Sequence, residues 1–394
     1  MESWLELLRR QYNYRLAERF NWWELNRCDV NSCSIRSCSI TDLKEKPSYY
    51  SQQKDLPNSK KLLPEYKQVQ SQVLQDCVKR VDKAYDRFIK TDATGKRFGK
   101  PRFKGKGRYH SFTFPSMKPD WIRVQQISLP KFGAVKLIQH RKIPDGSRIK
   151  TATITKKCDG WYINLSLEDA TVPLSTIDVV ATDDNTVGID LGLKEFLVTS
   201  NGEVVTIPKY YRKGQKKLAH SQRKLSRKKK DSKRRALAGK RVARHHLKVV
   251  NQRRDFHYKT AQWLLGGGQV VAHEDLNIKG LAKSKLAKSV NDAGWSSFIQ
   301  ILSVKAESSG QKVIAVNPYN TSQLCSVCGV KVAKDLSVRI HNCQHCGLKL
   351  DRDHNAAINI KTIAVGHPAT AQGRLDQKIP DDLRSPRCTL KKSA

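Results

Sequence analysis

Four cysteines near the C-terminal end of the chain have the spacing of a metal site. Cys325 and Cys328 form one C-x2-C pair, and Cys343 and Cys346 form a second pair 14 residues later. Two such turns can direct four thiolates at one point and close a tetrahedral Zn2+ site that has no open coordination position. Redox-active thiols are the alternative, but two pairs that are each followed by glycine favour a structural zinc ribbon.

Three acidic residues, far apart in the sequence, could bind a different metal. Asp190 lies within the apolar segment 187–191, Glu274 ends the apolar segment 270–274, and Asp353 follows the last cysteine of the two pairs by seven residues. Carboxylates from separate strand ends can converge on two Mg2+ ions about 4 Å apart, as in phosphodiester hydrolysis. Taken singly, Asp353 could instead cap a helix, and Asp190 and Glu274 could pair with basic side chains.

The apolar pattern around these acids predicts the elements that must position them. Two strands are expected over 186–199, followed by a tight turn at Asn201-Gly202, and further strands at 269–274 and 312–316. Helices are expected at 295–309 and 355–364. The order of strand with Asp190, basic helices, strand with Glu274, helix, strand and helix with Asp353 is the layout of an RNase H-like nuclease core.

The charge of the chain is strongly positive and clustered. Lys and Arg number 74 against 36 Asp and Glu, which gives 74 − 36 = +38. Between Arg212 and Arg254 there are 19 basic residues and one acid, Asp231. We expect a pair of helices whose basic face contacts a polyanion, with nucleic acid as the usual candidate. A solvated charged surface is the alternative.

The first half of the chain predicts helices followed by strands. Residues 1–90 read mainly as helix, with a polar, loop-like insert over 28–64 that contains three cysteines expected to be free. Residues 111–168 read as strands and predict a compact barrel-like module. Its expected strands include 121–129 and a pair joined by a turn at Asp159-Gly160. No run of about 18 apolar residues is present, so no membrane span is expected.

The second half resembles the TnpB family of transposon-encoded nucleases and the related type V CRISPR effectors. The matching segments follow the family's order: 188–192 (GIDLG), 273–276 (HEDL), 321–325 (TSQLC) with Cys328, and Cys343 and Cys346 followed by 351–357 (DRDHNAA). Weaker similarity covers 69–88 and 103–115. At its N-terminus the chain opens directly on the expected helix, where family members usually have a short strand first.

The resemblance implies a multidomain α+β fold. It comprises an RNase H-like (RuvC) nuclease core with an inserted zinc ribbon, and N-terminal helical and β-barrel-like (wedge) domains. The expected domains are a helical recognition domain with a polar insert (1–95), a β-rich wedge-like domain (96–172), a RuvC-like core with basic helices (173–320), a zinc ribbon (321–350), a final RuvC-like segment (351–365) and a disordered tail (366–394).

The resemblance also implies a function: RNA-guided, metal-dependent cleavage of guide-matched duplex DNA beside a short flanking motif, by a protein that a transposable element encodes. Its catalytic, Mg2+-binding triad carries over onto Asp190, Glu274 and Asp353, with Asp351 as second choice for the third position, while zinc is structural. The partners would be a noncoding guide RNA and the target DNA, in a prokaryotic cytoplasm at the nucleoid. The alternatives are a catalytically inactive or weakened guide-directed DNA-binding regulator and a transposase accessory protein.

Overall fold

The structure is a computed structural model that describes residues 1–26, 45–91, 95, 98–118, 121–123, 125–168, 179–335 and 338–366. The chain divides into two compact units, Met1–Ala170 and Thr171–Ala394, which are treated separately below. The three cysteines of the expected polar insert and the tail after Gly366 lie outside the described residues. Across the described ranges, no helix is both long enough and apolar enough to cross a membrane.

The second unit is built on a five-stranded mixed sheet with the order β11-β10-β7-β8-β9. Its three neighbouring strands β7, β10 and β11 are parallel, and β8 and β9 continue the sheet as antiparallel hairpins. The expected strands and the turn at Asn201-Gly202 are confirmed. The bounds are β7 Thr186–Leu191, β8 Glu195–Thr199, β9 Val204–Thr206, β10 Val270–Glu274 and β11 Lys312–Val316.

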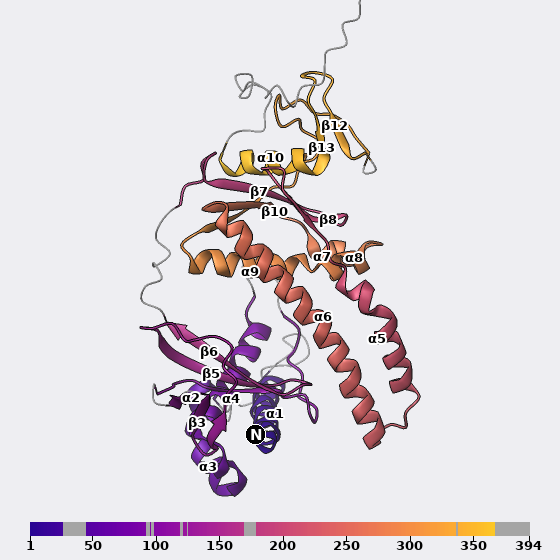
Figure 1. Ribbon diagram of the computed structural model, residues 1–394. Coiled ribbons are helices and arrows are strands. Elements are labelled where there is room, and N and C mark those ends of the chain that lie inside the picture. Colours follow the sequence, from indigo (N-terminus) through magenta and orange to yellow (C-terminus); the bar gives the residue numbers. More distant parts are fainter. Residues whose placement is uncertain are drawn as a thin grey trace, which may run out of the picture. The chain divides into compact units, whose positions relative to one another are not determined.

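Helices cover both faces of this sheet, with α6 and α9 on one side and α10 on the other (Figure 1). Alternate residues of a strand point to opposite faces. Ile189 and Val271 therefore belong to the core that α6 and α9 complete, while Ala272 packs with Ile360 of α10. The helices span Lys233–Gly266 (α6), Trp295–Ser308 (α9) and Arg352–Ala364 (α10), and the short α7 (Ile278–Leu281) and α8 (Ala287–Ala293) precede α9.

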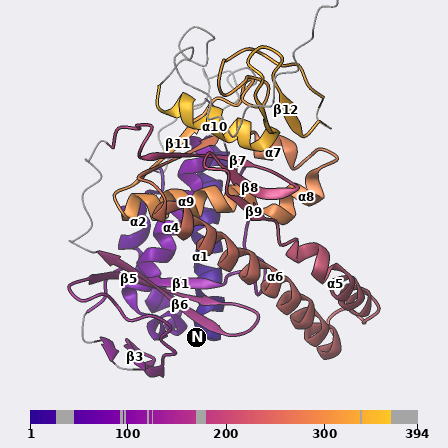
Figure 2. The same ribbon diagram turned by 45° about the horizontal axis from the view of Figure 1, so that its top comes forward.

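The basic region folds as the predicted helical pair. Helix α5 (Tyr210–Ser226) packs against α6, and the joined ends of the two helices run away from the sheet (Figure 2). The fully buried side chains of α6 all lie in its last third, from His257 onward. The preceding part of α6 therefore contributes little to the core and leaves its arginines and lysines at the surface.

The first unit has one hydrophobic core shared by its helices and strands. Helices α1 (Glu2–Asn26) and α4 (Ser71–Ile89) pack together. The expectation that the first 90 residues are mainly helical is confirmed for these two helices. The buried side chains of α4 recur at helical spacing: Val73, Leu74, Cys77, Val78, Val81 and Tyr85.

The expected barrel-like module is wrong. The described strands of this unit form two separate antiparallel sheets with the orders β1-β5-β6 and β2-β3-β4. Phe112 and Phe114 of β1 pack on Trp4 of α1, so a helix, rather than closure of the sheet on itself, covers their apolar face. The strands are β1 Ser111–Phe114, β2 Ile122–Arg123, β3 Gln126–Leu129, β4 Gly133–Lys136, β5 Arg148–Lys156 and β6 Trp161–Glu168.

Two further expectations for this unit need correction. The single strand expected over 121–129 is a hairpin of β2 and β3, in which Gln125 adopts a left-handed φ of 56°. The described part of the expected polar insert contains α2 (Tyr49–Lys54) and α3 (Leu56–Leu62), and η1 (Pro64–Gln68) follows. Ser48 caps α2 through a capping box, and the isolated apolar residue Leu56 is buried, so this stretch is anchored as helix. The turn at Asp159-Gly160 between β5 and β6 is as expected.

Candidate active site

Asp190 and Glu274 lie side by side on neighbouring parallel strands. Ile189 of β7 is paired with His273 of β10, so the next residue on each strand is one of the two acids. Aligned residues on adjacent strands point to the same face of the sheet. Both side chains are half-buried. The sheet therefore brings together two carboxylates that are more than 80 residues apart in the sequence.

Asp353 is close enough to Asp190 for its charge to act on that residue. Helix α10, which carries Asp353, lies along β7 (Figure 1). The contact is backbone against backbone at Gly188, two residues before Asp190. A Cβ atom at Gly188 would collide with the carbonyl oxygen of Ala357 and would lie 2.7 Å from the backbone nitrogen of Lys361. Only glycine allows α10 to approach this closely, and the approach sets the position of Asp353.

Asp351, and not Asp353, caps the helix. The Asp351 side chain accepts hydrogen bonds from the backbone N–H groups of Asp353, at 2.9 Å, and His354, at 3.3 Å. These bonds satisfy donors that would otherwise have no partner in the first turn. The capping interpretation of Asp353 is therefore wrong, and Asp351 has its carboxylate engaged as the N-cap.

Burial perturbs the two acids that the strands carry. Burial, followed by the negative charges of Glu274 and Asp353, raises the pKa of Asp190 to about 8, against an opposing effect of Arg352. Burial also raises the pKa of Glu274, although a hydrogen bond from the Thr321 hydroxyl lowers it in part. In the described part of the chain neither acid forms an ion pair, so the salt-bridge interpretation of these two residues is not supported there.

Asp353 differs because two arginines hold its carboxylate. Arg352 lies 3.0 Å from Oδ1, and Arg339, from the segment between the cysteine pairs, lies 3.3 Å from Oδ2. Among the described residues, the only group of three or more Cys, His, Asp or Glu side chains close enough to hold one ion is the cysteine cluster. The three acids are thus electrostatically coupled, but they do not converge on a common point.

These residues nevertheless suit divalent cations. Mg2+ binds carboxylate oxygens in preference to nitrogen or sulfur. Burial, followed by repulsion from the two neighbouring acids, raises the pKa of Asp190 to about 8, and bound divalent cations would offset that repulsion. The donor set therefore fits Mg2+.

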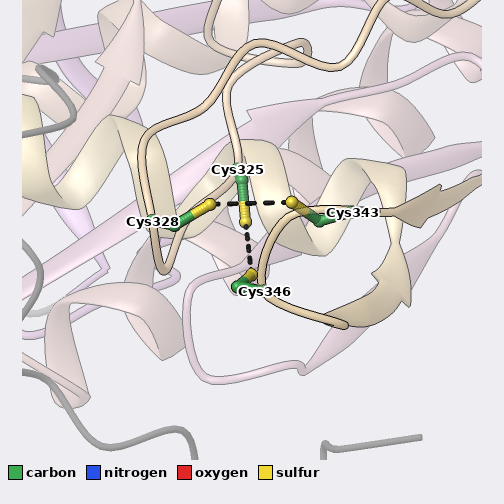
Figure 3. Close-up of side chains that lie close together, drawn as sticks. All are labelled: Cys325, Cys328, Cys343 and Cys346. Atoms are coloured by element: carbon green, nitrogen blue, oxygen red, sulfur yellow. Dashed lines mark hydrogen bonds between the residues drawn. The ribbon is translucent and has the colours of Figure 1, made fainter. Parts of the chain in front are cut away.

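The four cysteines form a compact tetrahedral cluster (Figure 3). Their sulfur atoms all lie within 4.8 Å of one another, with Cys325 and Cys346 3.5 Å apart and Cys328 and Cys343 3.6 Å apart. Zn–S bonds of about 2.3 Å place tetrahedral sulfurs about 3.8 Å apart, so the cluster fits zinc. Burial raises the pKa of the Cys325 thiol to about 11, and a cation is needed to keep all four groups as thiolates.

Two polar residues whose contacts were not predicted from the sequence connect this cluster to helix α10. Asn355 donates to the Leu324 carbonyl and accepts from the Ser326 N–H, and Asn359 donates to the carbonyls of Thr321 and Leu324. Both asparagines are fully buried. Their spacing of four residues on an otherwise apolar helix face was a usable signal, because buried amides require partners. Two short strands, β12 (Ile340–Asn342) and β13 (Lys349–Asp351), complete the cysteine segment.

Comparisons with known proteins match both halves of the second unit. The protein-family model described as "Probable transposase" matches residues 169–285. The family model described as "Cas12f1-like, TNB domain" matches residues 295–360. The first match contains Asp190 and Glu274, and the second contains the four cysteines and Asp353.

Curated relatives extend the similarity over most of the chain. A protein of Streptomyces pristinaespiralis named "Putative RNA-guided DNA endonuclease" is 31% identical over 329 residues, covering 82% of this chain and 78% of the relative. "Putative RNA-guided DNA endonuclease InsQ" of Escherichia coli (strain K12) is 32% identical, covering 78% of this chain and 77% of the relative. "TnpB-like protein L79" of Acanthamoeba polyphaga mimivirus is 31% identical over 47% of this chain and 38% of the relative.

The fold is also that of a solved structure. The chain aligns with the protein in a "Cas12f1-sgRNA-target DNA complex" with a TM-score of 0.54 and 13% identity, covering 91% of this chain and 81% of that one. The mixed α/β architecture is therefore shared, whereas the sequences have diverged. Together with the long matches at 31% and 32% identity, these findings confirm the resemblance seen in the sequence: the chain belongs to the TnpB family.

Proposed function

We propose that this chain is a Mg2+-dependent, RNA-guided DNA endonuclease encoded by a transposable element. The observation that carries the proposal is the placement of Asp190, Glu274 and Asp353 near one another by two parallel strands and one helix, where burial, followed by repulsion from the other two acids, raises the pKa of Asp190 to about 8. Such clusters of perturbed acids are typical of functional sites. The names of the relatives at 31% and 32% identity support the same activity.

The sheet order supports an RNase H-like (RuvC) nuclease core. Its central strand β7 carries Asp190 and lies between a parallel neighbour, β10, and an antiparallel hairpin, β8 and β9. The cysteine segment interrupts this core between β11 and α10. In the proposal this segment is a zinc ribbon in which Cys325, Cys328, Cys343 and Cys346 hold a structural ion.

Asp190, Glu274 and Asp353 would hold the Mg2+ ions. When bound, the ions would help to activate water and to stabilise the oxygen that leaves in phosphodiester hydrolysis. The protein's own part is positioning: β7 and β10 hold two carboxylates in register, and α10 supplies the third through the close contact at Gly188. Arg339 and Arg352 form ion pairs with the two oxygens of Asp353, and at least one of these pairs must break for that oxygen to bind an ion.

The basic helices α5 and α6 would bind the nucleic-acid backbone. The segment 212–254, which contains the connection between the two helices, has 19 lysines and arginines, enough charge to neutralise many phosphates. Base pairing with the guide would supply the choice of sequence. The Cas12f1 structure is that of a complex with an sgRNA and target DNA, which supports the same kinds of partner here. Cleavage next to a short flanking motif belongs to the same proposal.

A guided-cleavage assay tests this function. The full chain is produced together with RNA from the DNA that flanks its gene, and the copurifying RNA is sequenced. The segment of that RNA that pairs with DNA is then replaced. We expect the plasmid cleavage site to move with the new guide and cutting to require Mg2+. Absence of copurifying RNA, or cutting that ignores the guide, would overturn the proposal.

A second candidate is a guide-directed DNA binder that does not cut. Both oxygens of the Asp353 carboxylate are paired with arginines, and the acids of the described chain do not converge on an ion-sized point. In the same assay, this candidate predicts retention of matched DNA on a filter without cutting in Mg2+ or Mn2+.

A further inference from the structure

Thr321 is a buried polar residue at a critical junction of the second unit. It follows β11, precedes Cys325 by four residues, and is 2% exposed. It begins the TSQLC segment, in which only the cysteine has an assigned purpose. A buried hydroxyl is costly unless it forms a hydrogen bond, so its partner indicates its role.

The partner of Thr321 is one of the three acids. Its hydroxyl donates a hydrogen bond to Oε1 of Glu274. The hydroxyl oxygen of Thr321 also lies 3.1 Å from the carbonyl oxygen of Pro318. A hydroxyl has one proton to donate, and a carboxylate is a stronger acceptor than a carbonyl. The bond therefore fixes the orientation of the Glu274 carboxyl group, which has no ion pair among the described residues.

The backbone of Thr321 is itself fixed by the helix that carries Asp353. Asn359 of α10 is fully buried, and its Nδ2 lies 2.8 Å from the Thr321 carbonyl oxygen. Thr321 therefore connects β10, through Glu274, to α10. A shift of α10 would therefore move Asp353 directly and would also displace Glu274 through Thr321.

We propose that Thr321 is a positioning residue that holds Glu274 in the orientation needed to bind the divalent cation. This inference rests on the proposed function, because it assumes that Glu274 is a metal ligand. Partners that orient metal ligands in this way commonly contribute 10- to 100-fold to metal affinity or activity, in order of magnitude. Thr321 touches neither the substrate nor the ion in this account and acts only through Glu274.

Two substitutions separate the hydroxyl from the shape of the side chain. Thr321→Val keeps the branched shape and removes the donor, whereas Thr321→Ser keeps the donor and removes a methyl group. The full chain, freed of nucleic acid in high salt and retaining its zinc, is titrated with Mn2+ by calorimetry. We expect Thr321→Val to weaken Mn2+ binding by about 10- to 100-fold and Thr321→Ser to stay within about 3-fold of the unaltered chain.

Single-turnover cleavage provides the second readout. Thr321→Val should lower the cleavage rate at saturating DNA and leave DNA affinity unchanged, and Thr321→Ser should restore the rate. Unchanged Mn2+ binding in Thr321→Val, or an equal defect in both variants, would overturn the inference. Thr321→Ala replaces Thr321→Val if the valine variant loses its zinc or unfolds, and the same outcomes apply to it.

Glu274→Gln distinguishes failure of this inference from failure of the proposed function. Normal Mn2+ binding by Glu274→Gln would remove Glu274 from the metal site and overturn both. Weak binding by Glu274→Gln together with normal binding by Thr321→Val would leave the proposed metal site in place and overturn only the role of Thr321.

Discussion

The four cysteines are close together in the sequence, whereas the three acids are far apart in it. All four cysteines lie within 22 residues, and their sulfur atoms lie within 4.8 Å of one another. The acids come from two strands and a helix. Even the closest pair in sequence, Glu274 and Asp353, is separated by α7, α8, α9, β11 and the cysteine segment. Local turns bring the first site together, whereas only the complete sheet brings the second together.

The difference also extends to charge and suggests different functions. The cysteine cluster is closed, so it suits an ion that stabilises a small segment with little core of its own. The acids are only half-buried and do not converge, and one of them is held by arginines. A site that must exchange ions, substrate and product requires such openness. Substitutions at the two sites should therefore have different effects.

The largest effect is expected from opening the cysteine cluster. Cys343→Ser removes one of four thiolates, and structural zinc sites of this kind contribute about 10 kcal/mol or more to folding of their segment. We expect loss of bound zinc, measured by elemental mass spectrometry, and protease cleavage within 321–350. Cys158→Ser, outside the cluster, is the control and should retain zinc. A fully zinc-loaded Cys343→Ser variant would refute the four-cysteine site.

Gly188→Ala should disturb the arrangement of the three acids and leave the cysteine cluster intact. The added Cβ collides with the Ala357 carbonyl, so α10 must move away from β7, at a cost of about 3 kcal/mol. Urea unfolding should show this loss while zinc content stays unchanged. Gly266→Ala is the matched control, because a Cβ there meets nothing within 4 Å. Equal stability of the two variants would contradict the close packing of α10 on β7.

Asp190→Asn should stabilise the protein in the absence of Mg2+. Because the pKa of Asp190 rises from 3.8 to about 8 on folding, the folded state binds more protons than the unfolded state between these values. Stability therefore falls as pH rises from about 4 to about 8 and levels off above it. We expect the asparagine substitution to remove this slope and to add on the order of 2 kcal/mol at pH 8.

Urea unfolding in buffers free of Mg2+ and of chelators measures the effect, because a chelator would also strip the zinc. Glu307→Gln changes an exposed carboxylate of the same unit and should keep the slope. A slope that persists unchanged in the asparagine variant would show that the charge of Asp190 is not the cause of the pH dependence of stability.

The smallest effect is expected at Arg339. Its side chain is 45% exposed, and half-exposed ion pairs contribute about 1 kcal/mol or less. Arg339→Gln should free one oxygen of Asp353 and tighten Mn2+ binding by about 2- to 5-fold in calorimetry. Arg241→Gln on α6 removes a comparable charge away from the site and should leave Mn2+ affinity unchanged. Weaker Mn2+ binding in Arg339→Gln would contradict competition between the arginine and the cation.

What the sequence alone could predict follows the same division between local and assembled features. The cysteine spacing and the apolar segments around Asp190 and Glu274 are local patterns, and the strands that carry these acids lie where the patterns predicted them. The hydrogen bond from Thr321 to Glu274 joins residues 47 positions apart and depends on how β11 leaves the sheet. The capping role of Asp351 was also missed, because DRDHN offers two acids at the start of a helix and only the backbone selects between them.

The first unit illustrates the limits of strand prediction. The apolar, β-branched stretch 121–129 reads as one strand, but Gln125 turns the chain without the glycine or Asn-Gly pair that usually signals a hairpin. The barrel-like expectation failed for a related reason. Alternating apolar residues show that one face of a strand is buried, but they do not show whether a sheet or a helix covers it.

The most direct test of the central claim is to measure binding and cutting in parallel for Asp190→Asn. The variant is loaded with the RNA that copurifies with the unaltered chain, and matched duplex DNA is supplied with Mg2+. Loss of several kcal/mol of metal-assisted stabilisation predicts a cleavage rate lower by about 1000-fold. DNA affinity should remain within about 2-fold, because the basic helices are intact. Cleavage at the unaltered rate would contradict the account.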